Sequence, residues 1–349
     1  MMITIKDIAK IAGVSHSTVS RALSGHSGIS KETTDRIKKI ASDIGYVPSA
    51  VARGLKTSRS NALGVIVNRI DDPFFSEILQ GIEDVLQEAG YSLFVAASNR
   101  DSSREKIIVQ AMRERRVDGI IVCTTQFCDE HRSQLEHYGF PIIAIGNHEE
   151  SDYRWLVYHD DFYGSVQITK YLIELGHKKI AYLGNARAES TTQGRLNGLM
   201  QEMNAVSLPI PDEYIFQCPN GKPDGGEIGA KYCVDLVDPP TAIMCFNDMM
   251  AIGAIKALRE AGKCVPIDFS VVGFDDVPFS AYTYPTLTTF EQPKYQLGYE
   301  AAQMMYKFLQ SQSDMNSAKG QTLMLRGELI VRETTAPPSN KMNTGDSHL

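Results

Sequence analysis

The sequence predicts a small all-α head at the N-terminus and a larger α/β core with two parallel-sheet subdomains. Three observations predict this organisation. Up to Tyr46, short segments with capping residues carry apolar side chains at helical spacing. From Ala62 onward, short β-rich runs alternate with amphipathic helical segments, and this alternation occurs twice. Positive charge is concentrated in residues 1–60, whereas the rest of the chain is acidic.

The charge distribution separates the head from the core. The chain of 349 residues is long enough for two or three domains, and its net charge is −7. Residues 1–60 contain ten Lys and Arg but only four Asp and Glu, a surplus of six positive charges, so the remainder carries −13. A basic head on an acidic core is expected when only the head contacts phosphates.

The stretch from Thr4 to Leu23 predicts two short helices. Thr4 caps the first, Gly13 ends it, and Ser15 caps the second. The apolar residues of the first helix follow i, i+3, i+4, i+7 spacing and are Ile5, Ile8, Ala9 and Ala12. One outward face of the second helix consists of His16, Ser17, Ser20 and Arg21. Two short helices joined by a glycine turn are typical of a helix-turn-helix, so we interpret this stretch as a DNA-contacting element.

A third helix and a weak segment complete the head. Ser30 starts the third helix and Gly45 ends it. The three helices are expected to share a core of Ile8, Val19, Leu23, Ile37, Ile40 and Ile44. Ser49–Lys56 contains helix formers but is too short to be stable alone, and Gly54 weakens it further. This segment is either a plain linker or a hinge helix that folds on DNA. We assign residues 1–47 to the helix-turn-helix domain and 48–61 to the hinge and linker.

The core is predicted from its alternating elements, which imply parallel sheets covered by helices on both faces. The expected strands are 62–67, 92–97, 119–123, 141–145, 179–183, 214–216, 242–246, 270–274, 321–326 and 328–332. The expected helices are 75–89, 104–115, 129–138, 164–175, 195–203, 226–236, 249–261 and 297–310. We assign one subdomain to 62–159 with 292–321, and the other to 160–291 with 322–334. The polar tail 335–349 is expected to be disordered.

Cysteine usage and hydropathy indicate the compartment. The six cysteines are scattered without a CxxC pair, and several lie in apolar runs, so we expect buried, reduced thiols. The chain begins directly with a capped helix rather than a signal-like segment. No apolar run reaches the roughly 18 residues that a membrane span needs. We therefore expect a cytoplasmic protein with no membrane partner.

Several motifs occur together in a specific order. These are TIKDIAKIAGVSHSTVSRAL, SAVARGLK, RRVDGIIV, HKKIAYLG, FNDMMAIGA and VVGFDDVPFSAYTYPTLTTFEQP. With these motifs the chain resembles the LacI/GalR family of bacterial transcriptional regulators from residue 4 to about 334. The resemblance implies a helix-turn-helix head, a hinge helix and a periplasmic-binding-protein-like core that dimerises and binds a small effector. Members of that family are mostly repressors whose DNA affinity is set by a sugar, nucleoside or purine.

The resemblance also assigns DNA contacts. It implies that His16, Ser17 and Arg21 reach base edges in the major groove, where Arg paired with guanine is the commonest specific contact. Leu55 matches the hinge leucine that wedges into the minor groove and kinks the duplex. Gly54 departs from the small helix-favouring residue common in the family. Simple capping is the alternative role for the helix-terminal hydroxyls. The expected DNA-binding residues are Thr4, Ser15, His16, Ser17, Thr18, Ser20, Arg21, Ser30, Leu55 and Lys56.

The effector pocket is predicted from the sheets, because ligands bind at the carboxyl ends of parallel strands. The polar and aromatic residues expected there are Asp72, Phe74, Phe75, Asn147, Thr191, Arg195, Asn247 and Asp275. Carboxylate, amide and guanidinium groups beside an aromatic face suit a sugar. The resemblance implies ligand contacts for Arg195 and Asp275 and assigns Asn247 to the motif FND, whereas Asp248 and Asp276 are interpreted as helix caps. The stretch KPDGG stands where some sugar-binding relatives have a stacking aromatic, so the ligand class stays open.

Enzymatic functions find little support in the sequence. There is no GxxxxGK[ST] motif and no GxGxxG after a strand. His159-Asp160-Asp161 lies at the expected crossover between subdomains without a further ligand at suitable spacing, so we interpret it as structural. No metal and no cofactor are expected, and a solute-binding transport protein or a sugar-active enzyme are weaker alternatives.

The expected function is therefore a repressor of carbohydrate-use genes. It is expected to bind a pseudo-palindromic, double-stranded operator as a homodimer, with a tetramer left open, and to respond to a sugar or sugar derivative. The alternatives are a purine or nucleoside corepressor and action as an activator.

Overall fold

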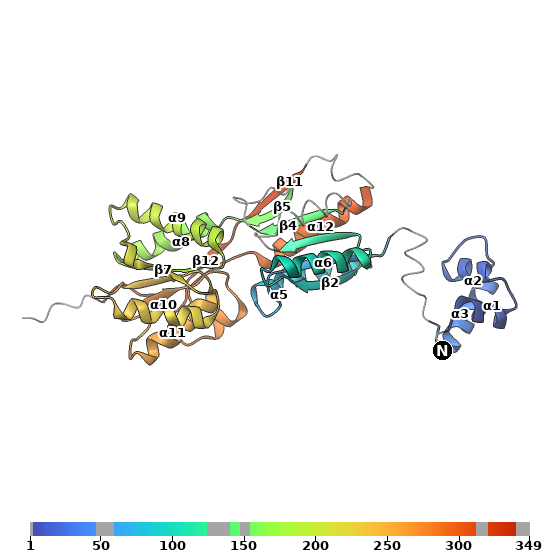
Figure 1. Cartoon of the computed structure of the whole chain (residues 1–349), viewed down its shortest axis with the longest axis horizontal. Helices are drawn as coiled ribbons and strands as arrows, with labels where there is room; N and C mark the ends of the chain where they lie inside the picture. The colour runs from blue at the N-terminus through green and yellow to red at the C-terminus, as the bar shows by residue number, and fades with distance from the viewer. Residues whose placement is uncertain (1–2, 47–58, 124–139, 147–153, 312–319, 340–349) are drawn as a thin grey trace, which may run out of the picture. The chain divides into compact units, whose positions relative to one another are not determined.

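The computed structural model describes residues 3–46, 59–123, 140–146, 154–311 and 320–339. The chain forms two compact units, Met1–Ser60 and Asn61–Leu349. We refer to them as the head and the core, and many of their elements are labelled in Figure 1. The predicted hinge segment 49–56, the predicted helix 129–138 and most of the predicted disordered tail lie outside the described residues.

The head consists of three helices around one small core (Figure 1). They are α1 (Ile5–Ala12), α2 (His16–Leu23) and α3 (Lys31–Asp43). Ile8, Val19 and Ile37 are completely buried between them. The other three residues of the predicted core, Leu23, Ile40 and Ile44, are only partly buried and pack against its edge.

Local capping explains where the head helices begin. At α1, the Asp7 carboxylate accepts hydrogen bonds from the backbone N–H of Thr4 at 2.8 Å and from its hydroxyl at 2.7 Å. These bonds lower the pKa of Asp7. Gly13 then ends α1 with φ of +66°, a left-handed conformation that favours glycine. The helices and caps predicted from the sequence are therefore present.

The first subdomain is built on a parallel sheet of six strands among the described residues. Its order is β11-β5-β4-β3-β1-β2. The strands are β1 (Ala62–Val67), β2 (Ser92–Ala97), β3 (Gly119–Cys123), β4 (Ile142–Gly146), β5 (Trp155–His159) and β11 (Gln321–Leu325). Its helices are α5 (Phe74–Glu88), α6 (Ser102–Glu114) and α12 (Lys294–Ser311). Helices α5 and α12 pack closely, since Gly81 and Gly298 let their backbones approach (Figure 1).

The second subdomain has a parallel sheet of four described strands in the order β7-β6-β8-β9. The strands are β6 (Ile180–Asn185), β7 (Ile215–Cys218), β8 (Ala242–Cys245) and β9 (Ser270–Val272). Helices α8 (Asp161–Glu174) and α9 (Glu189–Ala205) pack together, as do α10 (Pro223–Asp235) and α11 (Asp248–Glu260) (Figure 1). The strands β10 (Thr289–Glu291) and β12 (Glu328–Ile330) form a short antiparallel pair.

Three expectations need correction. Strands β5 and β10 were not expected; β10 has only three residues, TFE, whereas β5 is the short apolar run WLVYH. Helix α9 begins at Glu189 rather than at 195, since its polar first turns hide the helical period. Strand β11 pairs with β5 from Gln321 to Leu325, so the expected change of subdomain at residue 322 is wrong. The sheet to which an edge strand belongs depends on the strand it pairs with, and the local sequence pattern does not reveal that partner.

The chain passes between the two subdomains of the core three times within the described residues. The first crossover follows β5 at His159, the second follows β10 at Glu291, and the third joins β11 to β12. This connectivity brings the carboxyl ends of both sheets toward the crossovers, where side chains from both subdomains meet.

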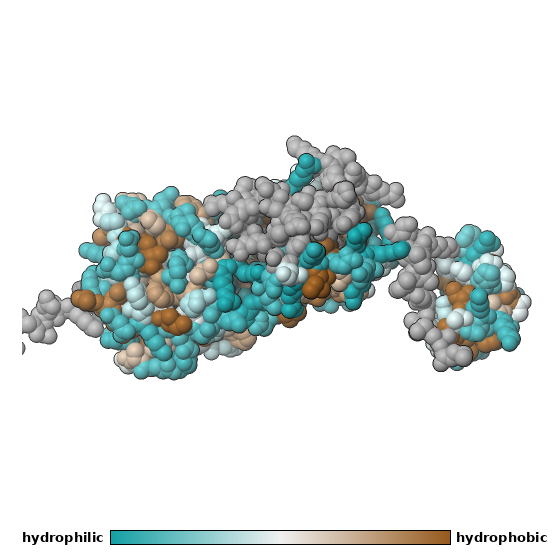
Figure 2. Space-filling model, viewed as in Figure 1, coloured by the Kyte–Doolittle hydropathy of each residue, from teal (hydrophilic) through white to brown (hydrophobic). Residues whose placement is uncertain are grey.

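The remaining expectations concern thiols, membrane spans and the surface. Four described cysteines are buried and unpaired, namely Cys123, Cys218, Cys233 and Cys245, whereas Cys264 is exposed. In the described part of the chain, no helix combines the length and apolar character that crossing a membrane requires. The face seen in Figure 2 is mostly hydrophilic, with small separate hydrophobic patches on the head and the core.

Candidate functional site

One side of α2 presents the polar residues that the sequence placed there. His16, Ser17 and Arg21 are exposed, and Ser20 is half-buried. The hydroxyl of Ser17 lies 2.8 Å from that of Ser15, which holds it at the start of the helix. The imidazole of His16 and the guanidinium of Arg21 are therefore not part of the head's core and lie on the surface with the Ser17 hydroxyl.

The helix N-termini of the head carry the expected hydroxyl side chains. Ser15 accepts a hydrogen bond from the backbone N–H of Thr18 at 3.1 Å, and their hydroxyl groups lie 2.8 Å apart. Ser30 accepts from the backbone N–H of Thr33 at 3.3 Å. These residues cap their helices, which is the structural role that the sequence allowed. Leu55 and Lys56 lie outside the described residues.

The core contains a cavity of about 1060 Å³ near the crossovers. Its lining includes groups that follow strands of both sheets, as expected for open parallel sheets. Seven residues predicted as effector contacts line this cavity, and they are Asp72, Phe74, Phe75, Thr191, Arg195, Asn247 and Asp275. Asn147 lies outside the described residues, although the preceding Gly146 lines the cavity.

Arg195 is the central cation of the cavity. It is only 3% exposed, and its Nε donates to Oδ1 of Asp161 at 2.8 Å. Its Nη2 lies 3.8 Å from Oδ1 of Asp275, and Nη1 donates to the carbonyl oxygen of Phe246. The guanidinium carbon lies 3.7 Å from the centroid of the Phe274 ring, a cation–π contact. Helix α9 thus holds a charged group between two carboxyl groups that come from distant parts of the chain.

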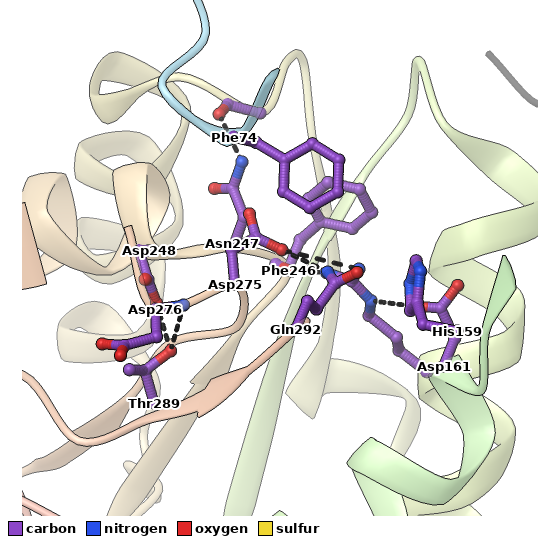
Figure 3. Close-up of polar contacts among 12 residues, drawn as sticks. Phe74, His159, Asp161, Phe246, Asn247, Asp248, Asp275, Asp276, Thr289 and Gln292 are labelled. Atoms are coloured by element: carbon purple, nitrogen blue, oxygen red, sulfur yellow. Dashed lines mark hydrogen bonds and ion pairs between the residues drawn. The ribbon is translucent and has the colours of Figure 1, made fainter. Parts of the chain in front are cut away.

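Asp161 and His159 extend this network to the first crossover. Nε2 of His159 lies 3.0 Å from Oδ1 of Asp161, and both side chains are buried (Figure 3). Burial alone would raise the pKa of Asp161, but Arg195 and His159 together hold it well below its usual range. Asp161 is therefore ionised. Among the described residues, no group of three or more His, Cys, Asp or Glu side chains is arranged to hold a metal ion.

Asp275 occupies an unusual backbone position beside the second crossover. Its φ is +116°, which is strained for a residue with a side chain. Lys294, at the start of α12, donates to its carbonyl oxygen at 2.6 Å and so stabilises the turn. Nε2 of Gln292 donates to Oδ1 of Asp275 at 2.5 Å (Figure 3). Burial raises the pKa of Asp275 well above its usual value, Arg195 opposes this shift, and neighbouring Asp248 adds to it.

Asn247 has two structural roles at the edge of the cavity. Its Oδ1 accepts from the backbone N–H of Met250 at 2.9 Å, so Asn247 caps α11. Its Nδ2 donates to the carbonyl oxygen of Gly221 at 3.0 Å, which ties α11 to the segment before α10 (Figure 3). The amide is therefore held in a fixed orientation where it meets the cavity.

The interpretation of Asp248 and Asp276 as helix caps is wrong. Asp248 is fully buried, and its carboxyl group accepts a hydrogen bond from the hydroxyl of Ser280 at 2.7 Å. It also accepts from the hydroxyl of Thr289 at 2.5 Å (Figure 3). It thereby holds the loop after β9 against α11, and burial raises its pKa to about 6. Asp276 instead pairs with Arg332 at 2.8 Å. Asn247 meets the capping requirement of α11, which leaves the Asp248 carboxyl group for tertiary contacts.

The aromatic residues of the cavity divide into core and lining. Phe75 is 7% exposed and belongs to the core of the first subdomain. Phe74 is partly buried and meets Phe75 edge-to-face at 5.2 Å between ring centroids. Backbone N–H of Phe74 donates to Asp72 at 3.1 Å, and burial raises the pKa of that carboxyl group. Phe246 supplies a further ring, 4.7 Å below the guanidinium of Arg195.

Several lining residues were not found from the sequence. The most important are His159, Asp161, Phe246 and Gln292. His159 and Asp161 were interpreted as structural because the sequence offers no further metal ligand at suitable spacing. The partner of Asp161, Arg195, lies 34 residues away. Gln292 gave no signal beyond its position at a crossover. The one sequence feature that pointed to the Arg195 network was Asp161, an acidic residue in the first turn of α8 directly after the predicted crossover.

Comparisons with known proteins agree with this architecture. Residues 4–49 match the family model described as "Bacterial regulatory proteins, lacI family". Residues 60–324 match the model "Periplasmic binding proteins and sugar binding domain of LacI family". The chain is 33% identical over 334 residues to the HTH-type transcriptional repressor PurR of Mannheimia succiniciproducens, and the match covers 95% of this chain and 98% of that protein.

Two solved structures are also similar. The lac repressor dimer bound to operator and the anti-inducer ONPF matches with a TM-score of 0.85 and 25% identity, covering 96% of this chain and 100% of that one. A LacI family transcriptional regulator from Enterococcus faecium with bound ribose matches with a TM-score of 0.70 and 28% identity, covering 79% of this chain and 99% of that one.

Proposed function

The chain belongs to the LacI family of bacterial regulatory proteins and is a DNA-binding transcriptional repressor; from this premise we propose that its effector is a sugar. We also propose that it binds a pseudo-palindromic operator as a homodimer. The observation that carries the effector proposal is the buried Arg195–Asp275 pair, which lines the core cavity together with Asn247.

The cavity has the chemistry that sugar binding needs. Hydroxyl pairs on a sugar are bound well by carboxylate, guanidinium and amide groups in fixed orientations. Arg195 is oriented by Asp161, and Asn247 is oriented by Gly221 and its own helix. Phe74 adds apolar surface to the lining. The regulator with bound ribose from Enterococcus faecium, which is 28% identical, supports the same ligand class.

A purine is the second candidate for the effector, because the relatives at 30–33% identity are repressors named PurR. A purine ring binds best between aromatic faces. The described lining segment Asn220–Pro223 contributes no aromatic side chain to the cavity, so it offers a stacking face to neither class of ligand. We favour the sugar because Arg195, Asn247 and Asp275 in the lining suit paired hydroxyl groups.

On DNA, we assign base contacts to His16, Ser17 and Arg21, which are exposed on α2. Helix-turn-helix proteins place the N-terminal part of the second helix in the major groove. We assign phosphate contacts to the remaining hydroxyl residues and to Lys56, and the minor-groove wedge to Leu55. The surplus of positive charge in the head favours binding to phosphates.

Exposed apolar side chains on the core support a homodimer. On the edge strand β2, Phe94 and Val95 are both exposed. A second set contains Phe279, Tyr282 and Tyr284, of which Tyr284 is 89% exposed. Apolar side chains gathered on a surface favour contact with another protein surface. Two copies would bring two heads to the two half-sites of one operator.

Effector binding is proposed to act through the crossovers. The cavity is lined by residues of both subdomains, so a bound sugar stabilises one relative orientation of the two subdomains over another. A change in that angle would alter the distance between the two hinge segments of a dimer, and hence the affinity for the operator.

The test has two parts. Thermal-shift screening of full-length protein uses D-ribose, D-glucose, D-galactose, D-fructose, cellobiose, hypoxanthine and guanine. Each hit is then added to operator-binding measurements at fixed salt, with the operator selected from a library of palindromes. A sugar that shifts both melting and operator affinity is expected. A response to purines alone would overturn the sugar assignment and leave the repressor assignment standing.

The DNA face is tested with paired variants. Arg21→Ala is expected to lose sequence preference, and Arg21→Lys should lose it too, because lysine keeps the charge but not the bidentate geometry. Leu55→Ala is expected to reduce DNA bending while preserving sequence preference. Normal preference in both Arg21 variants and normal bending in the Leu55 variant would contradict the assigned contacts.

A further inference from the structure

Three exposed arginines lie at the edge of the core where the chain enters from the head. Arg113 is in the last turn of α6, Arg115 is its C-cap, and Arg116 follows directly. Residues 61–349 carry a net charge of −13, so a group of three cations is unusual on this part of the chain. The effector cavity does not involve these arginines, because it lies at the opposite, carboxyl ends of the strands.

Hydrogen bonds fix the point where the chain enters the core beside the three arginines. Backbone N–H of Asn61 donates to Oδ2 of Asp118 at 3.0 Å, and N–H of Asp118 donates to the carbonyl oxygen of Ala62 at 2.7 Å. Strands β1 and β3 then run parallel, with Leu63 opposite Gly119. The arginines therefore lie next to the first residues of the core, to which the head is covalently joined.

Arg116 occupies a backbone position that favours glycine. Its φ is +53°, in the left-handed region. Three other core helices, α5, α8 and α11, have glycine directly after the C-cap, and these are Gly90, Gly176 and Gly262 with φ of +72°, +97° and +71°. Glycine would fit the end of α6 with less strain. The arginine side chain therefore needs a role beyond ending the helix.

The helix dipole accounts for only part of the group. Cations near a helix C-terminus interact favourably with the dipole. Arg113 and Arg115 already supply this charge, and Nη1 of Arg115 donates to the carbonyl oxygen of Ala111 at 3.3 Å. Arg116 forms no ion pair with any residue that the structure describes. Its guanidinium is therefore available to a partner outside the chain.

Two acidic residues flank the arginines, and both accept hydrogen bonds from other groups. Glu114 accepts from Nε2 of Gln110 at 2.9 Å. Asp118 accepts from the backbone N–H of Asn61. Neither of these bonds involves Arg116.

The positive charge of the head continues along the chain to this edge of the core. Residues 44–60 contain Arg53, Lys56 and Arg59 and no acidic residue. The head binds DNA, whose phosphates attract such a run of cations. A phosphate is therefore the partner that suits the guanidinium of Arg116.

We propose that Arg116, supported by Arg113 and Arg115, contacts a phosphate of the DNA duplex that the head binds, so that the core also takes part in DNA binding. An arginine pairs with a phosphate through two parallel N–H donors. Residues 47–60 span at most about 50 Å when fully extended, so a duplex bound by the head stays near this edge of the core. Phosphate contacts carry no sequence information, so this contact adds affinity without sequence preference. The inference needs the DNA-binding function of the chain but not a sugar effector.

The experiment measures how salt affects operator binding by the full-length protein. Fluorescence anisotropy gives the affinity for the operator selected from the palindrome library at salt concentrations between about 50 and 300 mM. Arg116→Gly removes the guanidinium and also relieves the left-handed backbone. For each chain bound, it should reduce the slope of log affinity against log salt by about 0.9 and weaken binding about fivefold at 0.15 M salt. Its melting temperature should stay the same or rise, whereas loss of a structural arginine would lower it.

Matched variants separate the charge from the shape of the side chain. Arg116→Gln should lose the same slope as Arg116→Gly, and Arg116→Lys should keep it because lysine retains the charge. Arg259→Gln is the control, since Arg259 is exposed in the last turn of α11 and has the same relation to its helix as Arg113. It should bind with the slope of the unmodified protein. A substituted operator base should cost the same factor in Arg116→Gly as in the unmodified protein, unlike in Arg21→Ala.

Two results would overturn the proposal. One is an unchanged slope and affinity in Arg116→Gly. The other is weaker binding with an unchanged slope, because the arginine would then act through the protein rather than on a phosphate. If the unmodified protein prefers no operator, the assigned base contacts of the head fail instead, and the same slopes measured on a duplex of random sequence decide the role of Arg116.

Discussion

Replacing Arg195 by methionine leaves two buried carboxyl groups, those of Asp161 and Asp275, without the cation that lies between them. The Nε–Oδ1 distance to Asp161 is 2.8 Å, and Nη2 lies 3.8 Å from Asp275. Arg195 is 3% exposed, so water does not screen these contacts. Methionine fills much of the same volume above Phe274 but supplies no charge. The substitution therefore removes the charge and its hydrogen bonds while keeping much of the packing.

The expected loss is about 3–5 kcal/mol in the free energy of unfolding at pH 7.5, the range for breaking one side of a buried ion pair. The loss should depend on pH. In the unmodified protein the pKa of Asp161 is held below its usual range, so its contribution is present above pH 4 and is lost as pH falls further. Without Arg195, burial raises this pKa. Protonation then relieves the variant at low pH, and its deficit should be smaller at pH 5 than at pH 7.5.

Urea unfolding of the full chain, monitored by far-ultraviolet circular dichroism at pH 5 and pH 7.5, measures the free energy of unfolding of each variant. The control is Lys179→Met, since Lys179 forms an exposed pair with Asp238 at 2.5 Å. That pair should contribute at most about 1 kcal/mol despite its shorter distance. Adding Asp161→Asn to Arg195→Met should recover part of the loss. The reasoning fails if Arg195→Met costs no more than Lys179→Met, or if its deficit is the same at both pH values.

Three further predictions concern single positions. Burial raises the pKa of Asp248 to about 6, so its protonation stabilises the fold at low pH and this stability is lost as pH rises through 6. Asp248→Asn should remove this pH dependence of the free energy of unfolding. An unchanged pH profile in the variant would contradict the prediction. Gly81→Ala should lower the melting temperature, because its Cβ would lie 2.2 Å from the carbonyl oxygen of Tyr295; an unaltered melting temperature would show that α5 and α12 separate easily. Ser15→Ala should cost about 1 kcal/mol of local stability, because it removes the acceptor for the backbone N–H of Thr18. The loss should appear as faster amide exchange in residues 16–23 of the full chain, and unchanged exchange would refute the prediction.

The head and the order of elements in the core were predictable from the sequence because near neighbours determine them. Helix α1 begins where Thr4 and Asp7 form a reciprocal cap and ends where Gly13 adopts a left-handed conformation. The strands β1 and β3 are continuous apolar runs, which the local pattern identifies directly. The rule that ligands bind at the carboxyl ends of parallel strands was sufficient to bring Arg195 and Asp275 to one cavity.

Only the tertiary structure decided what these side chains do in the cavity. Arg195 is oriented by Asp161, and Gln292 is hydrogen-bonded to Asp275, contacts between residues that are not close in the chain. The same holds for Asp248, whose carboxyl group the sequence assigned to capping. Helical periodicity and helix caps depend on contacts between residues a few positions apart, so the sequence reveals them. The partner of a buried charge across a crossover depends on packing and on the cost of burying that charge without a partner, which only the tertiary structure determines.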